Sequence, residues 1–171
     1  MRNSSTYNQN SFLNILREFI ILTKPRVNLL IMFTAIVGML LAHQDSLNYE
    51  LILFSSLGIG LAASAAAIIN HVVDQKIDSI MDRTKSRPLV NGSIKPLHAI
   101  YFALFLSVTS ITMLYVFVNT LTALLTLLSI IIYSVIYSVY LKNLTSQNIV
   151  IGGIAGAMPP LLGWTSITNQ I

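Results

Sequence analysis

Five long apolar runs, separated by short polar links, make up most of the chain. They are Val27–Ala42, Leu51–Ile69, Ala99–Val118, Thr120–Leu141 and Ile149–Ile167. Most hold about the 20 residues that a helix needs to cross about 30 Å of hydrocarbon. The alternating pattern of a barrel strand is absent, and in lipid only helices and closed barrels satisfy their own backbone groups. The pattern therefore predicts an all-α fold, a polytopic transmembrane helix bundle with five spans.

The residues before the first run divide into a polar and an amphipathic part. Residues 1–11 are polar and predict a frayed N-terminal tail, which is too long for the leader of a cleaved signal peptide. Residues 12–23 carry apolar positions at helical spacing and predict a short interfacial helix. Pro25 then marks the start of the next helix, because proline is tolerated in a first turn. We expect a tail over 1–11 and one membrane domain over 12–171.

Composition and charge agree with a membrane protein. Only 9% of the residues are charged and 54% are hydrophobic, against about 25% charged in soluble domains. The absence of cysteine excludes disulfides and thiolate metal sites. The net charge of +4 does not indicate nucleic acid, because the basic residues gather in three segments of the chain: Arg2–Arg26, Lys76–Lys95 and Lys142.

The same three segments predict the topology. The first and third links between the apolar runs carry no Lys or Arg. Because basic loops stay on the cytoplasmic side, we expect the N-terminus and the Asn70–His98 loop to be cytoplasmic in a multi-pass protein of the cell (inner) membrane. The lipid bilayer is then the first predicted partner.

Four oxygen-bearing side chains recur at every fourth position after the second apolar run: Asn70, Asp74, Asp78 and Asp82. Each four-residue step turns about 40° around a helix, so the first three share one face about 80° wide. Asp82 lies about 120° from Asn70 and is a weaker member. Carboxylates on one face repel each other unless a cation joins them. A solvated helix end with ion pairs to nearby Lys or Arg is the plain alternative.

Oxygen ligands of this kind suit Mg²⁺, which completes its octahedron with water and phosphate oxygens. Arginine binds phosphate through two parallel hydrogen bonds, and lysine adds charge. A lipid with a diphosphate head and an apolar tail, such as a prenyl diphosphate, fits such a site at a membrane boundary. The predicted catalytic and metal-binding residues are Asn70, Asp74 and Asp78, and the predicted diphosphate-binding residues are Lys24, Arg26, Arg83, Lys85 and Arg87.

Several other residues have two interpretations. Tyr133 and Tyr137 share a helix face and could stabilise a carbocation, although ordinary packing is the commoner role. His71 points about 100° away from Asn70, which favours packing over metal ligation. Gly and Ala residues cluster in the second and fifth runs and allow close helix contact, and Pro159-Pro160 predicts a kink or break in the fifth helix.

The spacing Asn70-x3-Asp74-x3-Asp78 resembles the first signature of the UbiA-type intramembrane prenyltransferases. Three longer runs, Leu22–Val27, Asp82–Leu89 and above all Gln147–Trp164, are similar to the branch of that family that acts on haem. The resemblance extends from Leu22 to the end of the chain.

This resemblance implies a fold of about nine spanning helices, of which the chain would supply the N-terminal part, truncated after the fifth. It implies Mg²⁺-dependent transfer of farnesyl from farnesyl diphosphate to a vinyl group of haem B, with haem as substrate and water added to give haem O. A second aspartate-rich motif expected in a later loop does not occur before Ile171, so we expect residues 1–171 to be inactive alone.

Three alternatives stay open. A relative that prenylates a quinone precursor would share the acidic motif, although the Gln147–Trp164 run argues against it. A divalent-cation transporter would need acidic residues inside the bilayer, where the five runs carry none. A non-catalytic membrane scaffold would leave the acidic positions unexplained.

Overall fold

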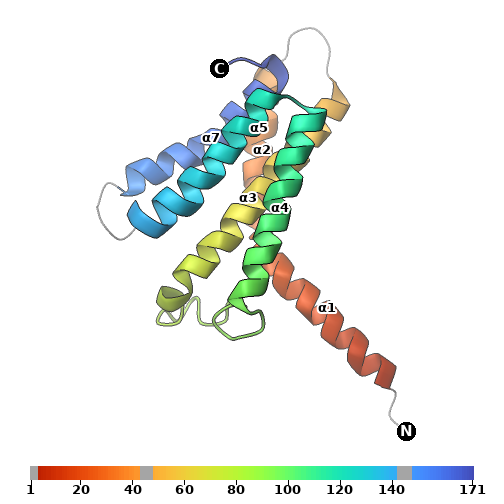
Figure 1. Ribbon diagram of the computed structural model, residues 1–171, viewed down its shortest axis with the longest axis vertical. Helices are drawn as coiled ribbons and strands as arrows, with labels where there is room; N and C mark the ends of the chain where they lie inside the picture. Colours follow the sequence, from red (N-terminus) through yellow and green to blue (C-terminus); the bar gives the residue numbers. More distant parts are fainter. Residues whose placement is uncertain (1–3, 43–47, 142–147) are drawn as a thin grey trace.

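The computed structural model describes residues 4–42, 48–141 and 148–171 (Figure 1). Lys142, used above for topology, lies outside these ranges. Within them every regular element is a helix, which confirms the all-α prediction. The elements in chain order are α1 (Ser4–Leu22), α2 (Pro25–Leu41), α3 (Tyr49–Asp78), α4 (Pro96–Phe117), α5 (Thr120–Ile131), the π-helix η1 (Ile132–Leu141) and α7 (Asn148–Thr168).

Three continuous helical stretches of the described chain are long and apolar enough to cross a membrane: Tyr49–Asp78, Pro96–Phe117 and Thr120–Ser138. A fourth candidate is the pair Phe12–Leu22 and Pro25–Leu41, whose axes differ by 48°. The bend falls at Lys24, which has a left-handed φ of 50°, just before Pro25. Since α7 is not among the candidates found in the described residues, five spans remain a prediction.

The first helix begins earlier than expected. α1 starts at Ser4, so the frayed tail predicted over residues 1–11 was wrong for residues 4–11. These residues contain no glycine or proline, and polar residues cost only tenths of a kcal/mol each in a helix. A helix formed on the apolar residues from Phe12 onward can therefore continue back through them. In Figure 1, α1 projects away from the other helices.

α3 is the central helix of the bundle. It packs against α4 on one side and contacts α2, α5, η1 and α7 elsewhere (Figure 1). Its 30 residues span about 45 Å, which exceeds the hydrocarbon thickness of about 30 Å. Its last turns can therefore reach the membrane boundary while the rest of the helix crosses the lipid.

α2 and α7 approach each other closely through glycines. A Cβ added at Gly163 would overlap the carbonyl of Ala35, and one added at Gly38 would overlap the carbonyl of Pro160. α7 runs as one helix through Pro159 and Pro160, so of the predicted kink or break the break was wrong, and the kink stays a prediction. Neighbouring helices can compensate the hydrogen bonds that proline removes within a membrane, and α2 lies directly against this segment.

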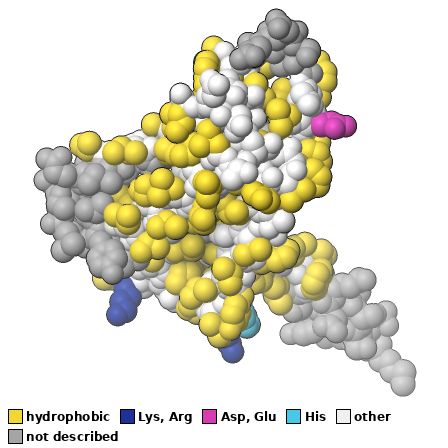
Figure 2. All heavy atoms as spheres, turned by 45° about the horizontal axis from the view of Figure 1, so that its top comes forward, with side chains coloured by type: hydrophobic (Ala, Val, Ile, Leu, Met, Phe, Trp, Pro, Cys, Tyr) yellow, Lys and Arg dark blue, Asp and Glu magenta, His cyan; other side chains and the backbone are white. Residues whose placement is uncertain are grey.

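Large apolar side chains are exposed along the outer helix faces, among them Phe33, Leu104 and Phe105. Figure 2 shows hydrophobic side chains over most of the visible face, with charged ones near its two ends. A surface of this kind suits lipid rather than water.

Candidate functional site

The last three turns of α3 carry the oxygen side chains that the sequence singles out. Asn70, Asp74 and Asp78 are buried, with exposed fractions of 7%, 6% and 5%. They therefore lie against the rest of the protein and do not face lipid. We call these three residues the oxygen ladder. Asp82 lies past the end of α3, and its exposed side chain pairs with Lys85 at 2.7 Å, which agrees with its weaker place in the pattern.

The loop after α3 folds back onto the ladder. Thr84 Oγ1 donates to the carbonyl of Asp78 at 2.8 Å, and Gln75 Nε2 donates to the carbonyl of Leu89 at 2.7 Å. Leu89 and Ile94 are buried in one cluster with α3 and α4 residues. These contacts hold Arg87 where its guanidinium pairs with the Asp78 carboxylate. Arg87 thus places a guanidinium cation beside the ladder.

The other predicted cations lie at different places. Lys24 lies at the start of α2 and lines the cavity described below, whereas Arg26, Arg83 and Lys85 are exposed. His71 is within electrostatic range of Lys24, Arg87, Asp74 and Asp78, so these groups share one region. A role for the three exposed cations in diphosphate binding remains a prediction.

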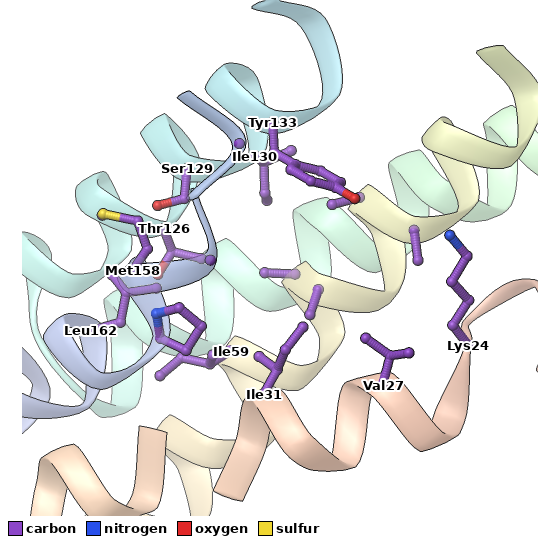
Figure 3. Close-up of a pocket in the computed structure, with 17 residues that line it drawn as sticks. Lys24, Val27, Ile31, Ile59, Thr126, Ser129, Ile130, Tyr133, Met158 and Leu162 are labelled. Atoms are coloured by element: carbon purple, nitrogen blue, oxygen red, sulfur yellow. The ribbon is translucent and has the colours of Figure 1, made fainter. Parts of the chain in front are cut away.

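A largely apolar cavity of about 390 Å³ lies between α2, α3, α5 and α7 (Figure 3). The α3 face that lines it continues into the ladder, because these positions recur every three or four residues: Ile59, Ala63, Ala66, Asn70 and Asp74. Figure 3 shows Lys24 at one end of the lining and Met158 and Leu162 at the other. The cavity therefore has a deep apolar end and an end close to charged groups.

Tyr133 lies where the cavity meets these charged groups. It lines the cavity, and its hydroxyl points toward the end where Lys24 lies (Figure 3). It is also within electrostatic range of Asp74. Its ring stacks on that of Tyr137 with centroids 5.5 Å apart, and a Cβ at Gly152 would lie only 2.8 Å from Tyr137 Cε2. The sequence indicated the shared face of the two tyrosines but not this boundary position.

Two buried polar residues beside the ladder were missed or left open by the sequence. Ser138 on η1 lies 3.2 Å from Asn70 Oδ1 through its Oγ. A single serine in an apolar run gives no signal of a partner so far away in the chain. His71 is 4% exposed, and within the described residues neither ring nitrogen has a hydrogen-bond partner. Its burial supports packing as its role.

The ladder fits a magnesium ion by donor chemistry. Its three side chains offer only oxygen or amide groups, which Mg²⁺ prefers over softer ligands. In the described part of the chain, no three His, Asp or Glu side chains are grouped closely enough to enclose a metal. Two carboxylates and an amide suit an ion that keeps water and phosphate oxygens in its shell.

These features define a class: a helical membrane protein in which a buried, oxygen-rich helix end opens onto an apolar cavity beside cations. The sequence matches the UbiA prenyltransferase family over residues 31–171, and the chain belongs to this family.

The curated relatives have one name in common. The chain is 52% identical to protoheme IX farnesyltransferase of Marinobacter nauticus and 53% identical to that of Legionella pneumophila strain Lens. It is 50% identical to protoheme IX farnesyltransferase 1 of Pseudomonas entomophila. Each match covers 91% of this chain and 51–53% of the relative. The chain thus spans about half the length of the curated relatives it matches.

A solved structure shares the fold. A UbiA homologue from Archaeoglobus fulgidus, bound to DMAPP and Mg²⁺, superposes with a TM-score of 0.72 at 18% identity. The match covers 90% of this chain and 55% of that chain. At this identity the likeness establishes the arrangement of helices.

Proposed function

We propose that the protein to which these residues belong transfers farnesyl from farnesyl diphosphate to a vinyl group of haem B and yields haem O. The observation that carries the proposal is the single face of α3, which lines an apolar cavity and then bears Asn70 and Asp74. The relatives named protoheme IX farnesyltransferase support haem as the acceptor.

The diphosphate head is assigned to the ladder end. Asp74, Asp78 and Asn70 would hold Mg²⁺, which draws electrons from a diphosphate and makes it a better leaving group. Arg87, already beside Asp78, and Lys24 at the cavity would neutralise the departing diphosphate. Arg26, Arg83 and Lys85 would add attractive charge from the exposed rim.

The farnesyl tail is assigned to the cavity. The volume of the cavity supports a prenyl group of about this length. An apolar cavity of about 150 Å³ accommodates one benzene, or about 25 Å³ per carbon. On that scale the cavity volume of 390 Å³ holds about 15 carbons. Farnesyl has fifteen carbons, whereas a five-carbon prenyl group would leave most of the space empty.

The chemistry then takes place at the boundary near Tyr133. The carbon–oxygen bond of the allylic diphosphate breaks, and the bonding electrons leave with the diphosphate. The vinyl group of haem supplies the electron pair for the new carbon–carbon bond, and water adds to the resulting cation with loss of a proton. The Tyr133 ring, which stacks on that of Tyr137, would stabilise the allylic cation through its π-face.

The membrane environment is part of the proposal. We propose that the chain lies in the cell (inner) membrane, with the ladder, the loop after α3 and the N-terminus at the cytoplasmic side. The placement of positive charge supports this orientation, because basic residues gather in the N-terminal segment and in the loop after α3, whereas the first and third links between the apolar runs carry no Lys or Arg.

The site is tested by comparing two aspartates of the same four-residue series. The full chain in lipid nanodiscs is titrated with farnesyl diphosphate in the presence and absence of Mg²⁺. Asp74→Ala should weaken Mg²⁺-dependent binding about 100-fold or more, because a buried charge partner of the ligand is lost. Asp82→Ala, at an exposed position, should bind as the parent does. Equal binding by Asp74→Ala and the parent would reject the site.

Turnover is tested separately. Two proteins are compared: residues 1–171 alone, and residues 1–171 joined to the second half of the Marinobacter relative. The haem is extracted from each for mass spectrometry. We expect a farnesylated, hydrated haem from the joined protein. If the joined protein binds farnesyl diphosphate but alters only a quinone precursor, haem is the wrong acceptor.

A further inference from the structure

The hydroxyl of Ser138 has two close neighbours and only one proton to share. Its Oγ lies 2.8 Å from the carbonyl oxygen of Tyr133 and 3.2 Å from the Oδ1 position of Asn70. A serine hydroxyl donates one hydrogen bond and accepts others, whereas a backbone carbonyl can only accept. The shorter contact, to Tyr133, therefore takes the proton.

The second contact must then run in the opposite direction. If Ser138 Oγ accepts, the group facing it from Asn70 has to be the NH₂ end of the amide. The two ends of an asparagine amide have nearly the same shape, and the surrounding hydrogen bonds decide which end faces which partner. In this arrangement Nδ2 takes the position facing Ser138 that the structure gives to Oδ1, and Oδ1 is turned away from Ser138. An amide oxygen turned away from Ser138 is the end that a magnesium ion requires.

The π-helix explains why this arrangement is held firmly. Tyr133 lies five residues before Ser138, which is the separation that hydrogen bonds close in a π-helix. Ser138 is fully buried, so water does not replace either contact. The Tyr133 side chain is restrained by its stacking on Tyr137. Ser138 thus links the wall of the cavity to the ladder.

We propose that Ser138 is a positioning residue that orients the Asn70 amide so that its oxygen serves the ladder. This inference rests on the proposed function only in assigning Mg²⁺ as the ion that uses the oxygen. Loss of the hydroxyl leaves the amide without its acceptor, and the NH₂ end then competes for the metal side. Partners that orient a metal ligand are commonly worth about 10–100-fold in affinity.

The first test uses two buried serines of the same helix. Ser134 is 1% exposed and, within the described chain, has no hydrogen-bond partner, so Ser134→Ala is the matched control for Ser138→Ala. The Mg²⁺ concentration that half-saturates farnesyl diphosphate binding is measured in nanodiscs. Ser138→Ala should raise it about 10–100-fold, whereas Ser134→Ala and binding of uncharged farnesol should not change. An unchanged Ser138→Ala, or an equal shift in Ser134→Ala, would overturn the proposal.

The second test replaces the amide of Asn70 with a carboxylate, which cannot donate a hydrogen bond. In Asn70→Asp the side chain only accepts, so Ser138 loses the donor it needs. We expect Mg²⁺-dependent binding to weaken although a carboxylate is the better metal ligand. If Asn70→Asp binds Mg²⁺ and farnesyl diphosphate more tightly than the parent, the amide oxygen already faces Ser138 and the proposal is wrong.

A third measurement needs no ligand and separates this inference from the proposed function. In chain labelled with ¹⁵N-asparagine, the side-chain NH₂ of Asn70 should exchange its protons slowly in the parent and in Ser134→Ala, and faster in Ser138→Ala. Equal exchange in all three would refute the amide orientation. Failure of the parent to bind farnesyl diphosphate would instead count against the proposed function, and the exchange result would still decide the role of Ser138.

Discussion

Small residues occur on both faces of α3, but they have opposite effects on the packing of the neighbouring helices. Toward α4 the face is closed: a Cβ at Gly58 would lie 2.6 Å from Leu114 Cδ2, and Ser110 Oγ donates to the Gly58 carbonyl at 2.6 Å. Toward α2, α5 and α7 the alanines line a cavity of about 390 Å³. Small side chains therefore bring helices together on one face and leave space on the other.

The difference lies in what opposes the small residues. On the α4 side a fully buried Leu114 fills the space above Gly58. On the cavity side the glycines of α7 add no bulk, since Gly156 lines the cavity and a Cβ there would meet nothing within 4 Å. One face thus closes on α4, and the other leaves the cavity to which we assign the farnesyl tail. Bulk added to each face should consequently affect different properties.

The largest effect, on ligand binding, is expected on the face of α3 that lines the cavity. Ala63→Leu adds three carbons to the cavity wall and should displace a similar part of a bound tail. At about 0.8 kcal/mol per methylene this is about 2.4 kcal/mol, or roughly 50-fold weaker farnesyl diphosphate binding. Titration in nanodiscs measures it, with Ala157→Leu on exposed α7 surface as the control. Unchanged binding in Ala63→Leu would place the tail elsewhere.

Bulk on the closed face should affect folding instead. Gly58→Val forces Leu114 to move and should cost about 1–3 kcal/mol of unfolding free energy, measured by denaturant titration in micelles. Gly153→Val is the control, because a Cβ at Gly153 meets nothing within 4 Å. The folded fraction of Gly58→Val should still bind farnesyl diphosphate. Loss of binding with unchanged stability would contradict the assignment of the two faces.

The smallest effect concerns the hydrogen bond across the closed face. Ser110→Ala removes the donor to the Gly58 carbonyl and should cost about 0.6–1 kcal/mol in the same unfolding assay. Thr112→Ala, exposed on the same helix, should cost less. A Ser110→Ala protein as stable as the parent would mean that close packing alone holds α3 to α4.

Local pattern was enough to predict the helices and the ladder. The five apolar runs predicted the helical elements from α2 to α7, and the four-residue spacing predicted that Asn70, Asp74 and Asp78 share a face. Both depend on the repeat of a helix, which involves near neighbours only. The same locality explains the errors, since residues 4–11 extend a helix begun beyond them and the Pro159-Pro160 segment is supported by α2.

The amino-acid sequence by itself determined that this protein is a membrane helix bundle with an oxygen-rich helix end, because hydropathy and periodicity are properties of neighbouring residues. Tertiary structure alone decided that Arg87 reaches Asp78, that Tyr133 stands at the cavity boundary and that Ser138 meets Asn70. The Ser138–Asn70 contact joins positions 68 apart in the sequence. Distances of that kind depend on how whole helices pack, and no local pattern encodes them.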